Sequence, residues 1–327
     1  MKFPSETIAE TVATLKHERQ KMGHLLLDLK KHQQAHPQDR PAHLAHLYQA
    51  QAHNIKILSA LIQSLPNQVP SPSAHPSKGY TRYTTCLNYL KRDWQAADEF
   101  AEVQQTMDRL HGLLKAHDSD RKIALVLGAG TGRFAYDLAP LFQQTIAIDA
   151  SITMGSLYYQ LLQSDLRFFQ LHLKNAKIAH DQEELIHASI QHTTQHTHTP
   201  LYATADACQL PLAPHSVSVI FSIYFTDVLP LDTWWPEVIR VLKPGGLFIH
   251  FGPLQYHFKS LFMCYAADDL RTAIQQSAFD IHNENWAPLS HLSSSNHVEQ
   301  HYQNWSFVAV HHPLKKSDAM RVQHSRK

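Results

Sequence analysis

The feature that most constrains the fold of this chain is an apolar run that ends in a glycine-rich loop. Residues 123–127 are all apolar, and Gly128, Gly130 and Gly132 follow at alternate positions before a helical pattern begins at Arg133. A short apolar run that ends at a turn signal is typical of a buried parallel strand. The glycines let the backbone turn tightly and let a ligand approach it, and the next helix offers unpaired N–H groups. The segment therefore predicts a strand, a ligand-binding loop and a helix in succession.

Strands and helices alternate after this loop. Further apolar runs predict strands at residues 145–148, 217–223 and 247–251, and the later segments 281–286 and 305–310 are the candidates for the last strands. Helical patterns lie at residues 133–141, 153–163 and 234–242. This alternation predicts the α/β class, with a Rossmann-like, doubly wound and mostly parallel sheet whose last two strands are antiparallel. Residues 164–200 are polar and rich in histidine, and we expect an insertion or a loop beside a strand there.

The part of the chain before the sheet is expected to be helical. Apolar residues recur at helical spacing over residues 5–65, with a break around Pro37 and Pro41. The predicted division is a helical hairpin at 1–66, a Pro/Ser-rich linker at 67–79, the main domain at 80–312, which begins with a helical region at 83–115, and a basic, disordered tail at 313–327. The apolar face of the hairpin must be buried, so we expect it to pack on the main domain or to form a homodimer contact.

Composition narrows the class of partner and the compartment. The chain has 29 Lys and Arg against 28 Asp and Glu, so nothing in its charge favours nucleic acid or an anionic membrane as a partner. Its three cysteines have no Cys-x-x-Cys spacing, which argues against a disulfide framework. No apolar run reaches the roughly 18 residues of a membrane span. We therefore expect a cytoplasmic protein with a small-molecule substrate.

An acidic residue after the second strand indicates a nucleoside-containing cofactor. Asp149 follows the strand predicted at 145–148, where a carboxylate can accept hydrogen bonds from ribose hydroxyls. A chance glycine turn is one alternative. A nicotinamide-binding loop is another, but it prefers G-x-G-x-x-G, whereas the spacing here is G-x-G-x-G.

Two later segments favour a different cofactor. Asp206-Ala207 precedes the strand at 217–223, and Leu-Lys-Pro-Gly-Gly occupies residues 242–246. Both resemble segments of the class I S-adenosylmethionine-dependent methyltransferases, in which the Asp-Ala pair contacts adenine. The second segment by itself is only a helix stop followed by a turn, so it serves as a marker of the fold.

Three further segments resemble one branch of that class. Residues 83–94 end in Arg92-Asp93-Trp94, residues 222–227 are Ser-Ile-Tyr-Phe-Thr-Asp, and residues 250–258 are His-Phe-Gly-Pro-Leu-Gln-Tyr-His-Phe. They resemble the pre-domain helix, the Phe-Phe-Ile-Asp segment and the Gly-Pro-Leu-Leu-Tyr-His-Phe segment of the carnosine N-methyltransferase family. The likeness covers about residues 80–310.

The resemblance implies S-adenosylmethionine as the cofactor and assigns roles to particular residues. The residues that would bind it are Tyr89, Arg92, Gly128, Gly130, Asp149, Asp206 and Ala207. Arg92 would contact the methionine carboxylate, Asp149 the ribose, and the Asp206-Ala207 pair the adenine. Asp227 and His257 would be catalytic and would hold an imidazole dipeptide. His291 falls nearest the position of a tyrosine on the family's substrate side, and it completes the predicted substrate-binding set.

The chain departs from the family at several of these positions. The family has a proline before the first glycine of the loop, and none stands there in this sequence. Asp149 replaces a glutamate, and Tyr89 replaces a glutamine.

Plainer interpretations compete with these roles. Asp227 would cap the next helix, His257 would be a core histidine in a chain with 26 histidines, and Arg92 would pair with Asp93 on a solvated helix. The histidines of residues 187–198 include i, i+4 spacings that suit zinc, but no cysteine or carboxylate completes a set there. We expect a solvated loop and no metal site.

Taken together, the sequence predicts an S-adenosylmethionine-dependent N-methyltransferase for a small imidazole-containing molecule such as carnosine. Methylation of another metabolite or of a protein histidine is an alternative in the same class. A non-catalytic binding or scaffold protein that retains the fold is a third, and a nicotinamide oxidoreductase is disfavoured by the glycine spacing.

Overall fold

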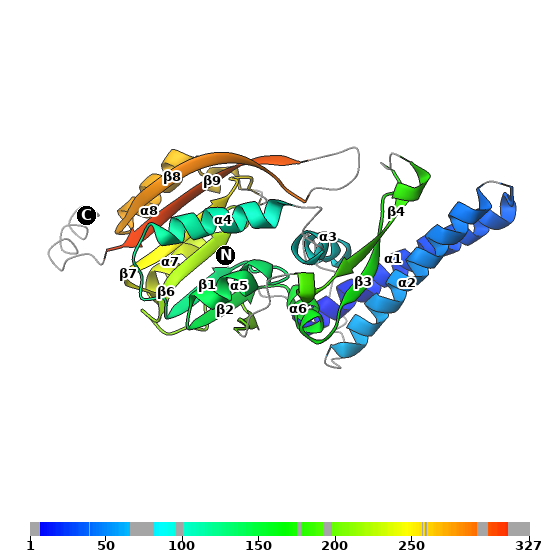
Figure 1. Cartoon of the computed structure of the whole chain (residues 1–327), viewed down its shortest axis with the longest axis horizontal. Helices are drawn as coiled ribbons and strands as arrows, with labels where there is room; N and C mark the ends of the chain where they lie inside the picture. The colour runs from blue at the N-terminus through cyan, green and yellow to red at the C-terminus, as the bar shows by residue number, and fades with distance from the viewer. Residues whose placement is uncertain are drawn as a thin grey trace.

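The computed structural model describes residues 7–38, 40–65, 82–95, 101–174, 178–192, 198–256, 258, 260–292 and 300–312. Its centre is a seven-stranded sheet in the order β5-β2-β1-β6-β7-β9-β8 (Figure 1). The strands are β1 (Ile123–Leu127), β2 (Gln144–Asp149), β5 (Leu201–Thr204), β6 (Val217–Ile223), β7 (Leu242–Gly252), β8 (Phe279–Ser290) and β9 (His301–His311). The first five in that order pair in parallel, and β9 is antiparallel to both of its neighbours. The predicted α/β doubly wound fold is confirmed.

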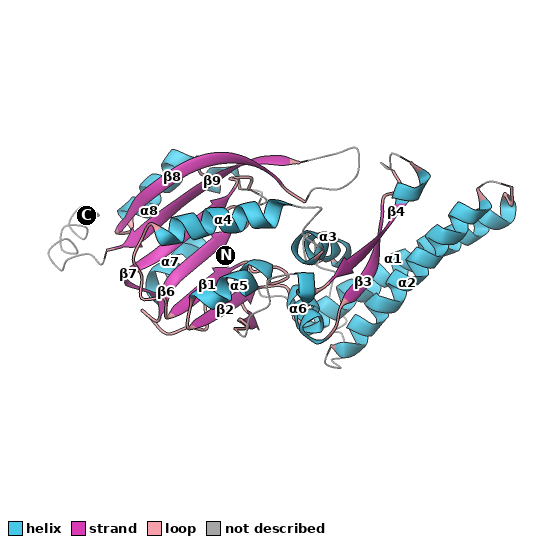
Figure 2. Cartoon of the chain, in the orientation of Figure 1, coloured by secondary structure: helices cyan, strands magenta, loops and turns pink. Residues whose placement is uncertain are grey.

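Helices cover both faces of this sheet (Figure 2). They are α4 (Ala101–Lys115), α5 (Arg133–Leu138), α6 (Ile152–Gln163), α7 (Leu231–Val241) and α8 (Ala267–Gln276). Successive side chains of a strand point to opposite faces, so Ala124 and Val126 of β1 join a core with α4, α5 and α6, whereas Leu125 and Leu127 join one with α7 and α8. The continuous apolar run of β1 is therefore the mark of a strand buried on both sides.

Most predicted elements lie where the patterns placed them, with informative differences. The strands at 123–127 and 217–223 are confirmed residue for residue. The helical region at 83–115 is two helices, α3 (Tyr83–Trp94) and α4. The predicted Lys-Pro-Gly-Gly turn belongs to the start of β7, where the pairing with β6 shifts register between Val217 and Val219. β5 and α8 had no counterpart among the predictions, because each is short.

An arm made of α1 (Ile8–Ala35), α2 (Pro41–Ser64), β3 (Leu166–Leu171) and β4 (Glu183–Ala188) projects from one side of the sheet (Figure 1). The two helices are the predicted hairpin. β3 and β4 pair antiparallel between α6 and β5, so residues 164–200 contain an insertion, one of the two expected alternatives, and these twelve positions are strands and not a loop. Asn54 of α2 fixes the strand pair, since its amide bonds both the N–H and the carbonyl of Phe169.

The arm and the sheet share one hydrophobic core. Leu15 of α1 and Leu58 of α2 are fully buried and belong to the same cluster as Leu157 of α6. The predicted linker and tail, residues 67–79 and 313–327, lie outside the described residues. None of the helices within the described ranges combines the length and the hydropathy that a membrane span requires.

Candidate cofactor and substrate site

A cavity opens at the carboxyl ends of β1, β2 and β6, the edge of an open α/β sheet where ligands bind. The seven residues predicted to bind the cofactor all line it: Tyr89, Arg92, Gly128, Gly130, Asp149, Asp206 and Ala207. The cavity together with the open space at its mouth amounts to about 1110 Å³. The sequence therefore predicted a set of residues, spread from α3 to the segment after β5, that the fold brings to one place.

Gly128 and Gly130 give the cavity its backbone wall. Both have a positive φ, 60° at Gly128 and 55° at Gly130, which residues with a side chain rarely adopt. A Cβ at Gly128 would come within 2.6 Å of Cδ2 of Phe225, so the loop and this ring are in direct contact. A Cβ at Gly130 would meet nothing within 4 Å. Gly130 thus leaves open space beside the backbone, as a cradle for a ligand requires.

Asp149 stands at the end of β2 with both carboxylate oxygens partly engaged. Oδ2 accepts from the N–H of Gly130 at 2.9 Å, and Oδ1 accepts from the N–H of Ser151 at 2.8 Å. Burial raises the pKa of Asp149 to about 6, although these two hydrogen bonds oppose the shift. Each oxygen has a further lone pair, so the carboxylate can also accept from two vicinal hydroxyls.

Arg92 reaches the cavity from the end of α3. Its Nε donates to Oδ1 of Asp93 at 2.6 Å, and its Nη1 lies 3.8 Å from Oε1 of Glu102. Burial disfavours the charged guanidinium, but the Asp93 and Glu102 carboxylates outweigh that effect and raise the pKa of Arg92 above its ordinary value. Three aromatic rings lie 5.0–5.7 Å from the guanidinium carbon: Tyr89, Phe134 and Tyr224. The alternative of a solvated Arg92 is wrong, because only 7% of its side chain is exposed.

One nitrogen of Arg92 has no hydrogen-bond partner within the described part of the chain. This atom is Nη1, and it is buried. A buried donor without a partner is costly and is uncommon in native proteins. Because Arg92 lines the cavity, this donor suits a carboxylate such as that of the methionine moiety of S-adenosylmethionine.

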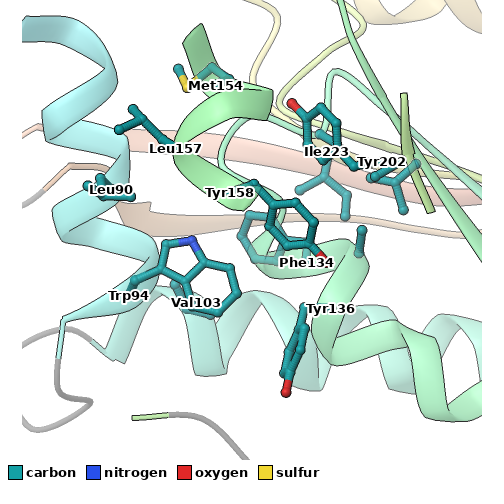
Figure 3. Close-up of a cluster of buried hydrophobic side chains, with 14 of the residues drawn as sticks. Leu90, Trp94, Val103, Phe134, Tyr136, Met154, Leu157, Tyr158, Tyr202 and Ile223 are labelled. Carbon is teal, nitrogen blue, oxygen red and sulfur yellow. The ribbon is translucent and has the colours of Figure 1, made fainter. Parts of the chain in front are cut away.

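Asp93 and Trp94 tie α3 to the glycine loop. The indole Nε1 of Trp94 donates to the carbonyl and the hydroxyl of Thr131, and the Thr131 hydroxyl donates to Asp93. The guanidinium of Arg133 donates to the Asp93 carbonyl and lies 5.6 Å from the Trp94 ring. Figure 3 shows Trp94 packed with Tyr136 and Tyr158. Trp94 is thus both a buried core residue and a hydrogen-bonded connection to the loop.

Asp227 lies at the same edge of the sheet, after β6. Its carboxylate is 4% exposed, and Oδ2 accepts from the N–H of Gln255 at 2.8 Å. It does not cap the next helix, because α7 begins at Leu231 with Pro230 at its N-cap. Residues on both sides of Asp227 line the cavity: Tyr224, Phe225, Val228 and Leu229.

Tyr256 and Tyr302 lie near enough to Asp227 for its charge to affect their phenols. Burial, with a contribution from the Asp227 carboxylate, raises the pKa of Tyr256 to about 12 and also raises the pKa of Tyr302. Tyr302 was not among the predicted residues. It places a phenol on the side of the site where the sequence comparison found no tyrosine.

His291 is buried beside the cavity. Its Nδ1 lies 3.2 Å from Oε1 of Glu102. Its ring is surrounded by tyrosines, with centroid distances of 4.7 Å to Tyr224, 5.0 Å to Tyr302 and 6.5 Å to Tyr89. Two of these rings also line the cofactor cavity. The predicted substrate residue His257 lies outside the described residues.

One of the histidines that suggested zinc, His187, has another partner in the structure. His187 bonds Oδ2 of Asp165 at 2.8 Å, and residues 193–197 are outside the described ranges. Among the described residues, no group of three or more His, Cys, Asp or Glu side chains could hold a metal ion.

Comparison with known proteins identifies the family. The sequence model of the carnosine N-methyltransferase family matches residues 72–313. No curated protein sequence matches significantly. Solved structures with a similar fold include the magnesium protoporphyrin IX methyltransferase of Synechocystis with bound SAM (13% identity, 71% of this chain and 93% of that chain, TM-score 0.47). Another is a phosphoethanolamine N-methyltransferase of Haemonchus contortus (16% identity, 71% and 58%, TM-score 0.44). The chain belongs to the carnosine N-methyltransferase family and is an S-adenosylmethionine-dependent methyltransferase.

Proposed function

We propose that this enzyme methylates a ring nitrogen of a small imidazole-containing molecule, with carnosine and related histidine derivatives as the first candidates. The observation that carries the proposal is the buried carboxylate of Asp227, held by Gln255 at the edge of the sheet between residues that line the cofactor cavity. A carboxylate in that place suits a substrate that presents a polarised N–H. Membership in the family supports the same class of acceptor.

The residues that line the cavity support S-adenosylmethionine as its ligand. Nη1 of Arg92, which has no hydrogen-bond partner among the described residues, would bind the methionine carboxylate, and Asp149 would accept the ribose hydroxyls. Asp206 and Ala207 would frame the adenine, with Asp206 held in place because its Oδ1 accepts from the N–H of Cys208 at 2.8 Å. When bound, the cofactor supplies an electrophilic methyl group on a sulfonium.

Asp227 has two tasks in the proposed reaction. It accepts the N–H of one imidazole nitrogen, which leaves the lone pair of the other nitrogen free as the nucleophile. When the ring becomes cationic, the carboxylate stabilises that charge and holds the proton that the ring then releases. Because Gln255 fixes Oδ2, the ring is oriented before reaction, and such alignment can contribute roughly 7–11 kcal/mol to lowering a barrier. We assign the other polar end of the substrate to His257 and His291.

Methylation of another metabolite or of a protein histidine remains the second candidate. His291 in place of the family's tyrosine and Tyr89 in place of its glutamine alter the wall of the site, which favours an acceptor of different shape. A homodimer through the helices of the arm, and a cytoplasmic location, which three free cysteines suit, stay predictions of the same kind.

A binding and transfer assay tests the proposal. We expect S-adenosylmethionine and S-adenosylhomocysteine to raise the Tm of the purified protein, and mass spectrometry to detect one added methyl group on carnosine or another histidine derivative. Failure to methylate any imidazole compound, with cofactor binding intact, would reject the acceptor class.

Asp227→Asn isolates the catalytic assignment. The variant should lower kcat by at least about 100-fold, as expected for a group that orients a ring and stabilises its charge, and leave the dissociation constant of the cofactor unchanged. Asp232→Asn, at an exposed acid in the first turn of α7, is the matched control and should behave as wild type. An equal loss of cofactor affinity in Asp227→Asn would contradict the role given to Asp227.

A further inference from the structure

We propose that Glu102 is a positioning residue that orients His291, so that Nε2 of His291 accepts a hydrogen bond from an N–H group of the methyl acceptor. This inference rests on the proposed function. It extends that function to a residue on α4 that no sequence motif marks.

The Glu102 carboxylate connects three segments of the chain. It is 2% exposed, and its Oε1 lies 3.2 Å from Nδ1 of His291 and 3.8 Å from Nη1 of Arg92. Its Oε2 accepts from the N–H of Leu292 at 2.9 Å. One carboxylate therefore joins α4 to the end of α3, on the cofactor side, and to the segment after β8, on the substrate side.

The hydrogen bond to Glu102 determines the tautomer of His291. An ionised carboxylate only accepts, so the hydrogen of a neutral His291 ring must be on Nδ1. Nε2 then carries the lone pair and is an acceptor. No described residue is hydrogen bonded to Nε2. A carboxylate behind a functional histidine commonly sets its tautomer and ring orientation in this way.

The His291 ring lies beside the wall of the cofactor cavity. Tyr224 and Tyr89 lie against the ring and also line that cavity. Tyr302 packs on the ring from β9. We therefore place the acceptor between Asp227 and His291, with one of its N–H donors toward Nε2.

The same carboxylate keeps Arg92 compensated. Arg92 is buried between Asp93 and Glu102, and Asp93 supplies the direct hydrogen bond. Removing Glu102 leaves that pair intact, so cofactor affinity should change little. The substitution should therefore weaken the binding of the acceptor but not that of the cofactor. Such a difference distinguishes a positioning role from a general loss of structure.

The tautomer is tested by nitrogen NMR of protein labelled in its histidines. His291→Gln identifies the His291 signals by their disappearance. We expect wild type to show the Nδ1–H tautomer, Glu102→Gln to retain it because the amide oxygen still accepts, and Glu102→Ala to lose it. A wild-type His291 with its hydrogen on Nε2, or an unchanged tautomer in Glu102→Ala, would overturn the inference.

The consequence for the acceptor is tested by kinetics. Glu102→Ala should lower kcat/KM for the imidazole substrate by about 10- to 100-fold, as for other groups that orient functional histidines, mainly through KM. Its cofactor affinity should stay within about threefold, and Glu102→Gln should recover most of the loss. Asp165→Asn, which removes the carboxylate partner of His187 on the arm, is the control and should have no effect.

The two levels of the proposal fail differently. An unchanged KM in a folded Glu102→Ala protein with altered tautomer rejects the role of Nε2 and leaves the proposed function in place. If wild type methylates no imidazole compound, the proposed function fails and the role given to Nε2 fails with it.

Discussion

The indole nitrogen of Trp94 donates to both the carbonyl and the hydroxyl of Thr131, at 3.1 and 3.0 Å. This contact joins the end of α3 to the middle of the glycine loop. Arg92, two positions before Trp94, brings the guanidinium into the cavity from the same helix. The helix that carries Arg92 and the loop that carries Gly128 and Gly130 are therefore joined by Trp94, together with the hydrogen bonds of Thr131 and Arg133 to Asp93.

Trp94→Phe should weaken this connection without emptying the core. The substitution keeps an aromatic ring beside Tyr136 and Tyr158 but removes both hydrogen bonds to Thr131. We expect a loss of about 1–3 kcal/mol in the free energy of unfolding and weaker cofactor binding. Chemical denaturation and calorimetric titration with S-adenosylmethionine measure the two effects. Unchanged affinity would show that the loop keeps its position without the indole.

Gly128→Ala and Gly130→Ala should separate stability from binding. At Gly128, a Cβ would lie 2.6 Å from Cδ2 of Phe225, and the backbone has a φ of 60°. Backbone strain alone costs about 1–3 kcal/mol, and the clash adds to it, so the free energy of unfolding should fall by more than the strain alone. At Gly130 the strain is similar, but the Cβ enters open space. Gly130→Ala should therefore remain better folded and still lose cofactor affinity. Equal Tm values for the two variants would contradict this account.

Cofactor binding should release protons near the pKa of Asp149. Burial raises that pKa to about 6 from 3.8, and ribose hydroxyls form stronger hydrogen bonds with the ionised carboxylate than with the protonated acid. Affinity should therefore fall as the pH drops below about 6. Calorimetric titrations at that pH, in buffers of different ionisation enthalpy, should report proton release, and Asp149→Asn should abolish it. Proton uptake would reject the assignment.

Protonation of Asp149 weakens cofactor binding but stabilises the fold of the protein without its cofactor. Because the pKa of Asp149 is higher in the folded state, this group favours folding at low pH, and that contribution is lost as the pH rises from about 4 to about 6. Asp149→Asn should remove this component of the pH dependence of unfolding, as urea denaturation at a series of pH values can measure.

The arm should unfold together with the sheet. Leu58 of α2 is fully buried in the core that also contains Leu157 of α6. Leu58→Ala should cost about 2–5 kcal/mol and lower the Tm of a single calorimetric transition. Leu27→Ala, at a residue of α1 that is 54% exposed, is the control and should leave the Tm unchanged. A separate early transition for the arm would show that the two parts fold independently.

Local patterns were sufficient for every strand of the sheet except β5 and for much of the cofactor wall. The strands at 123–127 and 217–223, the glycine loop and Asp149 at the end of β2 follow from burial, turn chemistry and position along the chain. Each of these features depends on only a few adjacent residues. The strands β3 and β4 escaped prediction because their burial depends on contact with α2, which a local pattern does not contain.

The sequence by itself determined the fold class and the cofactor, and it identified residues that line the cofactor cavity. Only the tertiary structure showed that Glu102 meets His291, 189 positions away, and that Trp94 holds Thr131. Pairs of this kind leave no trace in periodicity, because hydrogen bonds between distant segments depend on how helices pack on the sheet. The substrate side of the site is built from such pairs, which is why the sequence alone left it open.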